Sequence, residues 1–411
     1  MKPTVLVATT ARWVATARLA VAFSHAGYSV EAVCPPGHPL GKTSVIDRTH
    51  PYDGLAPLAS FADAIAATKP DLVVPGDDLA ARHLHDIHSR ERLRGKSQGW
   101  MSALIERSLG TPESFPLVFA RTALMDVAHA EGVRVPRTRV VADASDLRTC
   151  MEEMGLPMVL KADGTSGGEG VRIVHTVEEA ERALRVLQAP PLLARAGKRA
   201  LIDRDRTLIW PSLLRRRFVV NAQESVSGRE ATSAIACWRG NVLAGLHFKV
   251  LSKRQTAGPA TVLRLIDNPE MADAAEKMVR RLNLSGIIGL DFMLQESTGN
   301  AYLIEMNPRA TQVGHLTLGP GRDIPATLYA AVSGQTVREG PKLTDNEVIT
   351  LFPHEWTRNP ASAFLRSGYH DIPWEEPELI RACLRSRQGR TGWYSFQKWF
   401  HALSPIRISR S

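Results

Sequence analysis

Residues 157–171 read PMVLKADGTSGGEGV and combine a lysine, Lys161, with a cluster of glycines that could bind phosphate. The glycines are Gly164, Gly167, Gly168 and Gly170. A P-loop places its lysine after the glycines and opens a helix, whereas here the lysine comes first and the strand-like VRIVH follows. The pattern predicts a β-hairpin whose tip can fold over a polyphosphate, because glycine lets backbone N–H groups approach closely. A plain hairpin with a surface lysine is an equally good interpretation of this segment alone.

A second set of polar residues, Asp291, Glu305 and Asn307, lies in two apolar segments, GIIGLDFML and AYLIEMNPR. A tight turn at the intervening STGN would make Asp291 and Glu305 cross-strand neighbours, with Cβ atoms about 5 Å apart. Asn307 is two positions after Glu305 and therefore faces the same side. A register slip of one residue would turn Asp291 to the other face, and a solvated acidic hairpin is the alternative.

Two carboxylates on one buried surface repel each other, and a hard divalent cation would relieve that repulsion. Oxygen ligands suit Mg²⁺, or Mn²⁺, particularly when phosphate oxygens complete the octahedron. The sequence therefore predicts a metal site at Asp291, Glu305 and Asn307.

The elements that must position these residues change in kind along the chain. TVLVATT, YSVEAVCP and DLVVPGDD read as strands that alternate with helices, which predicts an α/β domain with a parallel sheet. No GxGxxG follows the first strand, where TTARW stands instead, so a dinucleotide fingerprint is absent. Residues 89–114 are interpreted as a loop-rich boundary, and the segments from residue 218 onward predict successive strands of an α+β part.

Composition is that of an ordinary globular protein: 411 residues, 44% hydrophobic and 23% charged, with a net charge of +9 that favours anionic ligands. The four cysteines are far apart, which predicts free thiols in a reducing cytoplasm. The N-terminus superficially resembles a signal peptide, but Arg12 and Arg18 interrupt its apolar run. The sequence contains no uninterrupted apolar stretch of about 20 residues, so no membrane span is expected.

The order of these motifs resembles the ATP-grasp superfamily: a lysine with a glycine-rich hairpin, then QESVSGRE, GLDFML and IEMNPR. The resemblance covers roughly residues 1–330, and the combination is specific although each motif alone is weak. It implies a pre-ATP-grasp α/β domain at 1–115 and a two-lobed ATP-grasp fold that clamps ATP. The lobes would be 116–220, with the glycine hairpin, and 221–335, with the metal site; a C-terminal extension would occupy 336–411.

The resemblance also implies roles in binding the triphosphate and the adenine. Arg121 would be the first basic phosphate contact and Lys161 the second, while residues 164–170 would cover the β- and γ-phosphates. Many members have a lysine where Arg121 stands, so the charge is kept and its geometry changes. Gln223 would face the adenine amino group, although many members have a glutamate there.

Further residues receive roles from the same resemblance. The backbone from Glu224 to Val226 would bond the adenine edge, and Glu230 would accept the ribose hydroxyls. Arg309 would grip the substrate carboxylate or its acylphosphate, and Lys249 and Arg264 would contact the γ-phosphate or the substrate. An exposed strand glutamate at Glu230 and solvated charges at Lys249 and Arg264 are the alternatives.

The activity implied is an ATP- and Mg²⁺-dependent ligase that joins a small-molecule carboxylate to an amine through an acylphosphate, releasing ADP and phosphate. Three alternatives stay open. Bicarbonate could be the carboxylate that is activated, a kinase could use the same site, or the chain could be a non-catalytic ATP-binding sensor.

The C-terminal tail is basic and carries an amphipathic pattern. Its apolar face consists of Phe396, Trp399, Phe400 and Leu403. This face could make weak contact with an anionic membrane, or it could pack against the body of its own chain. Nucleic-acid binding is not expected, because net charge is its only support. The resemblance suggests a homodimer, and the composition suggests a cytoplasmic location.

Overall fold

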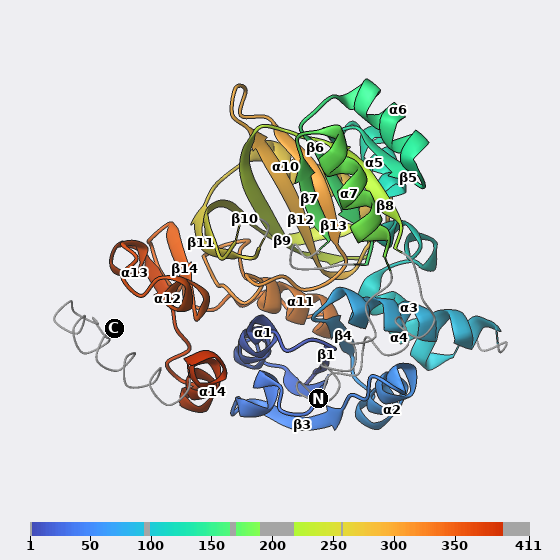
Figure 1. Ribbon diagram of the computed structural model, residues 1–411. Helices are drawn as coiled ribbons and strands as arrows, with labels where there is room; N and C mark the ends of the chain where they lie inside the picture. The colour runs from blue at the N-terminus through green and yellow to red at the C-terminus, as the bar shows by residue number, and fades with distance from the viewer. Residues whose placement is uncertain (1, 94–98, 165–169, 190–217, 256–257, 389–411) are drawn as a thin grey trace.

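Three β-sheets form the frame of the chain in the residues that the structure describes (Figure 1). The computed structural model describes residues 2–93, 99–164, 170–189, 218–255 and 258–388. The sheets are a four-stranded parallel sheet near the N-terminus, a four-stranded antiparallel sheet in the middle of the chain, and a seven-stranded sheet that reaches into its C-terminal part. The mixed α/β and α+β class predicted from the sequence is confirmed.

The N-terminal sheet has the strand order β3-β2-β1-β4 and helices on both faces. Its elements are β1 (Thr4–Ala8), α1 (Val14–His25), β2 (Ser29–Cys34), β3 (Ile46–Pro51), α2 (Pro57–Thr68), β4 (Leu72–Pro75), α3 (Asp78–Leu93) and α4 (Trp100–Leu109). Val5 and Val7 of β1 pack in one apolar core with α1, and Leu6 packs in the other core with α2 and α3. Both faces of the sheet are therefore buried, as expected of a parallel sheet.

Residues 89–114 are more helical than the sequence suggested. They contain the end of α3 and all of α4, which buries Leu104 and Ile105 against α3 and the parallel sheet. The loop-rich interpretation was wrong for the described part of this stretch, because charged residues such as Arg90, Arg92 and Arg107 lie on exposed helix faces while Leu104, Ile105 and Leu109 are buried.

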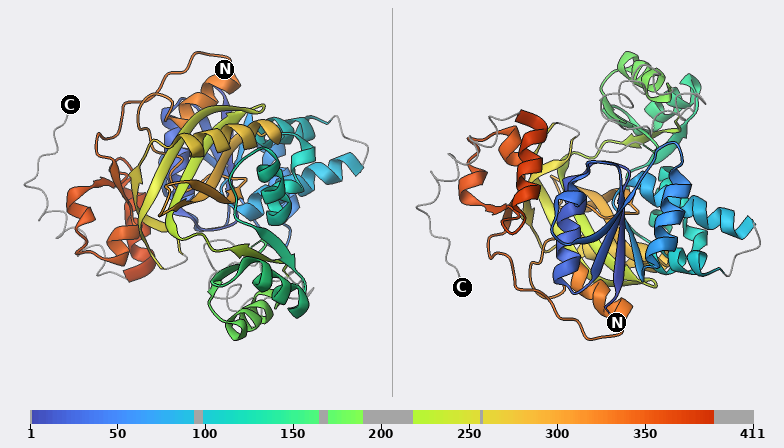
Figure 2. Two further views of the ribbon diagram at one scale, coloured as in Figure 1. Left: turned by 90° about the horizontal axis from the view of Figure 1, so that it is seen from above. Right: turned by 90° about the horizontal axis from the view of Figure 1, so that it is seen from below.

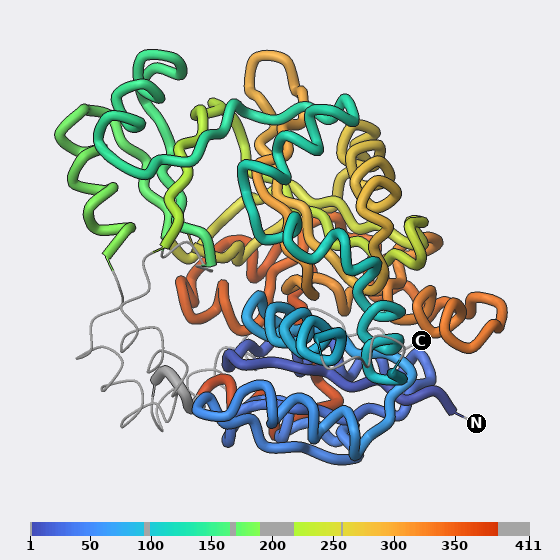
Figure 3. Tube along the Cα trace, turned by 90° about the vertical axis from the view of Figure 1, so that its right-hand side faces the viewer, coloured from blue at the N-terminus to red at the C-terminus, as the bar shows by residue number. Residues whose placement is uncertain are grey.

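The small antiparallel sheet has the order β5-β8-β6-β7. Its elements are β5 (Thr138–Val141), α6 (Ala144–Met154), β6 (Met158–Ala162), β7 (Val171–Val174), α7 (Val177–Gln188) and β8 (Val220–Glu224). The preceding helix, α5 (Arg121–Ala130), packs in the core of the large sheet. The predicted hairpin around the glycine cluster is confirmed, because β6 pairs with β7 on either side of it. Figure 3 shows this lobe (green) projecting from one side of the molecule.

The large sheet has the order β13-β12-β9-β10-β11-β14-β15. Its first strands and their helices are β9 (Gly228–Trp238), β10 (Asn241–Lys253), β11 (Ala260–Leu265), α10 (Pro269–Arg281), β12 (Gly286–Gln295), β13 (Ala301–Asn307) and α11 (Ile324–Ser333). Helix α10 covers one face of this sheet, and the N-terminal domain with α11 covers the other (Figure 2).

The segment after residue 336 continues this sheet. Its elements are β14 (Val348–Leu351), α12 (His354–Arg358), α13 (Phe364–Ser367), β15 (Tyr369–Asp371) and α14 (Pro377–Gln388). Asp371 of β15 is buried and pairs with Arg18 of α1, and it accepts a hydrogen bond of 2.7 Å from His315 Nε2. The last strands are therefore tied to the first helix.

The division into four units stays a prediction, although two of its boundaries meet continuous structure. The boundary at residue 220 falls within β8, a strand that pairs with the small sheet, and the boundary at residue 336 precedes two strands of the large one. Among the described residues, no helix is both long and apolar enough to cross a bilayer. The amphipathic tail pattern at residues 396–403 lies outside the described residues.

Candidate active site

The two strands at one edge of the large sheet bring Asp291 and Glu305 together. Asp291 of β12 lies directly opposite Glu305 of β13, and on its other side it lies opposite Thr232 of β9. Asn307 is paired with Gly289 on the same face. The predicted cross-strand pairing is confirmed, and a small register irregularity follows immediately after Asp291.

The charges of these two carboxylates are balanced unequally. Burial, together with the neighbouring charge of Glu305, raises the pKa of Asp291 to about 6. Asp291 accepts hydrogen bonds from the Thr232 hydroxyl at 2.8 Å and from Asn307 Nδ2 at 3.0 Å. Burial alone would also raise the pKa of Glu305, but the charges of Arg121 and Lys161 outweigh it and the pKa is lowered. The protein thus neutralises Glu305 and leaves Asp291 with an unfavourable charge.

This donor set fits a divalent cation that is completed by phosphate. Among the residues described, no group of three or more His, Cys, Asp or Glu side chains could hold a metal ion by itself. Mg²⁺ commonly takes only one or two carboxylates and completes its shell with substrate phosphates and water. Asn307 points its Nδ2 at Asp291 and its Oδ1 at Arg309, so its amide would turn to offer oxygen to a metal. A cation there would relieve the repulsion that raises the pKa of Asp291.

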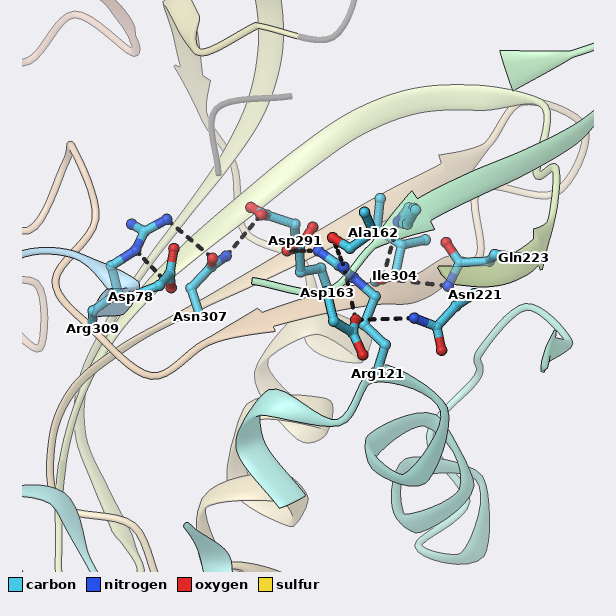
Figure 4. Close-up of polar contacts among 12 residues, drawn as sticks. Asp78, Arg121, Ala162, Asp163, Asn221, Gln223, Asp291, Ile304, Asn307 and Arg309 are labelled. Atoms are coloured by element: carbon cyan, nitrogen blue, oxygen red, sulfur yellow. Dashed lines mark hydrogen bonds and ion pairs between the residues drawn. The ribbon is translucent and has the colours of Figure 1, made fainter. Parts of the chain in front are cut away.

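Two cations face these carboxylates, Lys161 of β6 and Arg121 of α5, a helix whose buried side packs in the core of the large sheet. Figure 4 shows Arg121 beside Asp163 and Ala162. Arg121, the first residue of α5, donates to Glu305 Oε1 at 2.5 Å, to Asp163 Oδ1 at 3.1 Å and to the carbonyl oxygen of Ala162 at 3.1 Å. Asn221 Nδ2 donates to the same Asp163 oxygen at 3.0 Å. Arg121 therefore links Asp163, just after β6, to Glu305 of the large sheet, through ion pairs that a bound triphosphate could replace.

Lys161 lies at the end of β6 with only 5% of its surface exposed. Its Nζ donates to the carbonyl oxygen of Ile304, the neighbour of Glu305, at 3.3 Å. Burial lowers the pKa of Lys161 to about 8, although the charges of Glu305 and Asp291 act in the opposite direction. A buried ammonium close to Glu305 and Asp291 is well placed to attract an anion.

The predicted adenine and ribose contacts lie along β8 and the start of β9. Gln223 is buried, and its Nε2 donates to Thr138 Oγ1 at 3.1 Å and to the carbonyl oxygen of Ile304 at 3.4 Å. Glu224 forms an ion pair with Arg137, and its backbone N–H donates to the Arg137 carbonyl oxygen at 2.9 Å.

In the connection between β8 and β9, Val226 is half-buried. Near the start of β9, Glu230 pairs with Lys253 at 2.5 Å. Glu230 shares the sheet face of Thr232 and Asp291, since side chains two apart on a strand point the same way. The nucleotide roles of these residues stay predictions.

The glycine hairpin is described only at its base. Gly164 has a φ of +75°, and the backbone N–H of Ala162 donates to the Gly170 carbonyl oxygen at 2.9 Å. The positive φ favours glycine at position 164. Gly167 and Gly168 lie outside the described residues.

Arg309, two residues after β13, is held by the N-terminal domain as well as by the last residue of that strand. Its Nε donates to Asp78 Oδ1 at 3.1 Å, its Nη2 donates to Asn307 Oδ1 at 3.1 Å, and its guanidinium lies 5.6 Å from the centre of the Trp13 ring. The neighbouring Asp77 accepts hydrogen bonds from the loop after β1 and fixes that loop beside the site.

The sequence did not identify Asp163, Asn221, Trp13 or Asp78 as partners of the site. Asp78 stands in the strand-ending VVPGDD, and acids at the carboxyl end of a parallel strand are a usable signal. The other three contact site residues only through tertiary packing.

Lys249 lies on a different face of the large sheet from Asp291 and Glu305. It lies opposite Ala231 of β9 and Arg264 of β11, and Ala231 packs in the core beneath α10. Asp291 lies opposite Thr232, the next residue of β9, which points to the other face of the sheet. This register does not support the predicted phosphate contact of Lys249, and the same holds for Arg264. A period-two pattern reveals that faces alternate, but only the pairing shows which face meets the ligand.

Comparisons with known sequences agree with this geometry. A family model described as the ATP-binding domain of the carbamoyl-phosphate synthase L chain matches residues 120–317. The chain is 28% identical over 181 residues to the carbamoyl phosphate synthase large chain of Methanothermobacter thermautotrophicus, and 26% identical over 182 residues to that of Methanosphaerula palustris. The alignments cover 43% and 44% of this chain, which spans only 16% of the length of either relative.

Solved structures share the fold at low identity. The N5-carboxyaminoimidazole synthetase of Staphylococcus aureus, solved with ADP, has a TM-score of 0.56 at 14% identity, covering 82% of this chain and 80% of that one. The biotin carboxylase domain of the Hydrogenobacter thermophilus 2-oxoglutarate carboxylase, solved with MgADP and bicarbonate, has a TM-score of 0.55 at 17% identity, covering 82% and 71%.

The parallel N-terminal sheet and the two facing lobes define an ATP-grasp fold. The matching ATP-binding domain at residues 120–317 agrees with this fold and with the resemblance to the ATP-grasp superfamily that the motifs predicted.

Proposed function

We propose that this chain is an ATP- and Mg²⁺-dependent ligase that activates a carboxylate as an acylphosphate and joins it to an amine. A carboxylate is a poor electrophile, so forming a C–N bond in water requires activation. In the first step a carboxylate oxygen of the substrate attacks the γ-phosphorus of ATP, the bond from that phosphorus to the β,γ-bridging oxygen breaks, and ADP leaves. In the second step the amine nitrogen attacks the carbonyl carbon, its C–O bond to phosphate breaks, and the nitrogen loses a proton.

Charge neutralisation is the main contribution that the side chains would make. Phosphoryl transfer depends on positioning and electrostatic stabilisation rather than on a protein nucleophile. Lys161 approaches from β6 of the small sheet, Arg121 from the start of α5, and Arg309 from the end of β13, where it would grip the substrate carboxylate. The three cations therefore surround the place where the triphosphate and carboxylate would meet.

The metal would be held by Asp291, Glu305 and Asn307. When bound there, Mg²⁺ supplies positive charge that neutralises phosphate oxygens. The folded chain favours a cation here, because burial, and then the neighbouring charge of Glu305, raise the pKa of Asp291. ATP bound with its magnesium would bring the compensating charge, and the Arg121–Glu305 ion pair would give way to contacts with phosphate.

The observation that carries the proposal is the placement of Asp291 and Glu305 side by side, with Lys161 facing them from the small sheet and Arg121 paired with Glu305. The test is release of inorganic phosphate from ATP and Mg²⁺ in the presence of a library of carboxylates and amines. Glu305→Gln should abolish metal-dependent turnover without unfolding the chain. Glu296→Gln is the matched control, because Glu296 is exposed in the turn of the same hairpin. Full activity in Glu305→Gln would overturn the metal assignment.

Bicarbonate is the second candidate for the activated carboxylate. The biotin carboxylase domain of Hydrogenobacter thermophilus shares the fold and was solved with bicarbonate. The phosphate-release assay therefore needs an arm with bicarbonate as the sole carboxylate. Turnover in that arm alone would favour a carboxylase-like reaction, and ATP binding with no turnover in any arm would favour a sensor.

We also infer that the chain works in the cytoplasm, as a homodimer. All four cysteines are buried and free, which fits a reducing compartment. The related fold of the Hydrogenobacter domain was solved as a dimer. Light scattering on the purified chain measures this directly, and a monomer at micromolar concentration would contradict the dimer.

A further inference from the structure

Arg82 is a charged residue beside the candidate site that has no role in the reaction outlined above. It lies on α3 of the N-terminal domain, one helical turn after Asp78, and is partly buried. Residues four apart on a helix share a face, so Arg82 lies on the same side as the partner of Arg309. Within the described part of the chain, its guanidinium makes no hydrogen bond and no ion pair.

An aromatic ring fixes the position of this guanidinium. Arg82 Cζ lies 4.0 Å from the centre of the Phe119 ring. Phe119 in turn meets the ring of His85 edge-on at 5.4 Å, and His85 stacks on Phe115 at 3.8 Å. Stacking holds an arginine by its face and leaves its N–H donors, which lie in the plane of the group, available. Among the described residues, Arg82 is therefore positioned by its ring contact and not by hydrogen bonds.

The surroundings place Arg82 at the base of the glycine hairpin. A Cβ atom added to Gly164 would lie 3.8 Å from Arg82 Nη2. Burial lowers the pKa of Arg82, whereas the charges of Asp78 and Asp163, and then that of Asp86 on the same helix, act to raise it. The first two of these carboxylates are the ones nearest the site. Both of those carboxylates are already bound, Asp78 by Arg309 and Asp163 by Arg121. Arg82 thus lies between two ion pairs and adds a positive charge that neither of them neutralises.

We propose that Arg82 contacts the phosphoryl group that this chain transfers from ATP. The inference rests on the proposed function and adds a cation to it from the N-terminal domain. Arg121 and Arg309 must exchange a carboxylate partner to bind an anion, whereas Arg82 presents unused donors beside the hairpin that would cover the γ-phosphate. A guanidinium fork matches the oxygens of a phosphoryl group, and its charge would follow the group as the bond to the β,γ-bridging oxygen breaks and the bond to the carboxylate oxygen forms. No proton transfer is required of Arg82.

The test compares nucleotides that differ in the γ-phosphate. The affinities of AMP-PNP and ADP, each with Mg²⁺, are measured by calorimetry for the wild type, Arg82→Gln, Arg82→Lys and Arg90→Gln. Arg90 is exposed on the same helix and serves as the matched control. Arg82→Gln should weaken AMP-PNP binding by about 10- to 100-fold, since hydrogen bonds to charged groups contribute about 1.5–3 kcal/mol, and should change ADP binding by less than about twofold. The AMP-PNP affinity of Arg82→Lys should lie between those of the wild type and Arg82→Gln, and the affinity of Arg90→Gln should equal that of the wild type.

The outcomes separate this inference from the function on which it rests. Equal losses for AMP-PNP and ADP would overturn it, because Arg82 would then act on folding or on phosphates that the two nucleotides share. Unchanged affinities for both nucleotides would also overturn it. Thermal unfolding of each variant shows whether a loss of nucleotide affinity comes from a folding defect. If Arg82→Gln is unstable, the nucleotide affinities of the more conservative Arg82→Lys variant provide the test. A wild-type chain that binds neither nucleotide would overturn the proposed function itself.

Discussion

The seven-stranded sheet carries a buried cluster of charges at each of its two edges, and the two clusters are balanced differently. At the β13 edge, burial and the charge of Glu305 raise the pKa of Asp291 to about 6. At the β15 edge, burial would raise the pKa of Asp371, but Arg18 and His315 more than offset it and the pKa is lowered. At the β13 edge, the negative charge of Asp291 remains unfavourable. At the β15 edge, the negative charge of Asp371 is stabilised by cations of the folded chain.

The difference indicates which cluster serves structure and which serves chemistry. A buried carboxylate with its own cation and hydrogen bonds needs nothing from outside the protein. A carboxylate raised in pKa by a like charge favours whatever positive charge can enter, which is a property expected of a binding site. Burial alone does not separate the two edges; the partners of each charge do.

Removing the compensated carboxylate should have the largest effect on stability. Asp371→Asn leaves the buried Arg18 guanidinium without its anion, so the free energy of unfolding should fall by about 3–5 kcal/mol. Urea denaturation followed by circular dichroism measures the loss. If Asp371→Asn lowers the free energy of unfolding by less than about 1 kcal/mol, the ion pair at the β15 edge does not stabilise the fold and the contrast with the β13 edge is wrong.

Removing the uncompensated carboxylate should have a smaller effect of opposite sign. Asp291→Asn abolishes its repulsion with Glu305 and keeps a side chain of the same shape, so the chain without nucleotide should gain on the order of 1 kcal/mol at pH 7. The same denaturation experiment reports it. Mg²⁺-dependent phosphate release should be lost in this variant, and a destabilised Asp291→Asn chain would contradict the imbalance.

The cation facing the uncompensated edge should make nucleotide binding depend on pH. Lys161 has a pKa lowered to about 8, so a rise in pH removes its proton and weakens its attraction for phosphate. Affinity for AMP-PNP should fall by about 3- to 10-fold between pH 7 and pH 9. Lys161→Arg keeps its charge across this range and should remove the slope. An identical slope in both chains would assign the pH dependence to another group.

The smallest effect is expected from a cation on the opposite face of the sheet. Lys249→Gln should change AMP-PNP affinity by less than about twofold, because the register of β10 turns this side chain away from Asp291. Calorimetry on this variant beside Lys161→Gln provides the comparison. A loss as large as that of Lys161→Gln would return Lys249 to the nucleotide site.

The sequence predicted local relations well. Asp291 and Glu305 are joined by a short turn, so hairpin geometry alone was enough to pair them. The hairpin after Lys161 followed in the same way from a strand, a glycine cluster and a second strand. Both predictions depend on contacts between residues close in the chain, where spacing carries most of the information.

Relations across the chain could not be predicted. Arg309 meets Asp78 from 231 positions away, and Arg121 meets Glu305 from 184 positions away. Arg82 belongs to a helix with charges on several faces, and only packing against Phe119 selects its direction. The two C-terminal strands, of four and three residues, are too short for alternation to be recognised.

The ion pair between Arg18 and Asp371 joins residues 353 positions apart, and this spacing has a consequence during synthesis. On the ribosome, α1 can form early, but the anion that neutralises its guanidinium emerges only after most of the protein has been translated. During most of translation, Arg18 of the nascent N-terminal domain would therefore have no Asp371 to pair with. The ion pair between the first helix and the last strand would form only when the C-terminal part of the chain has been synthesised.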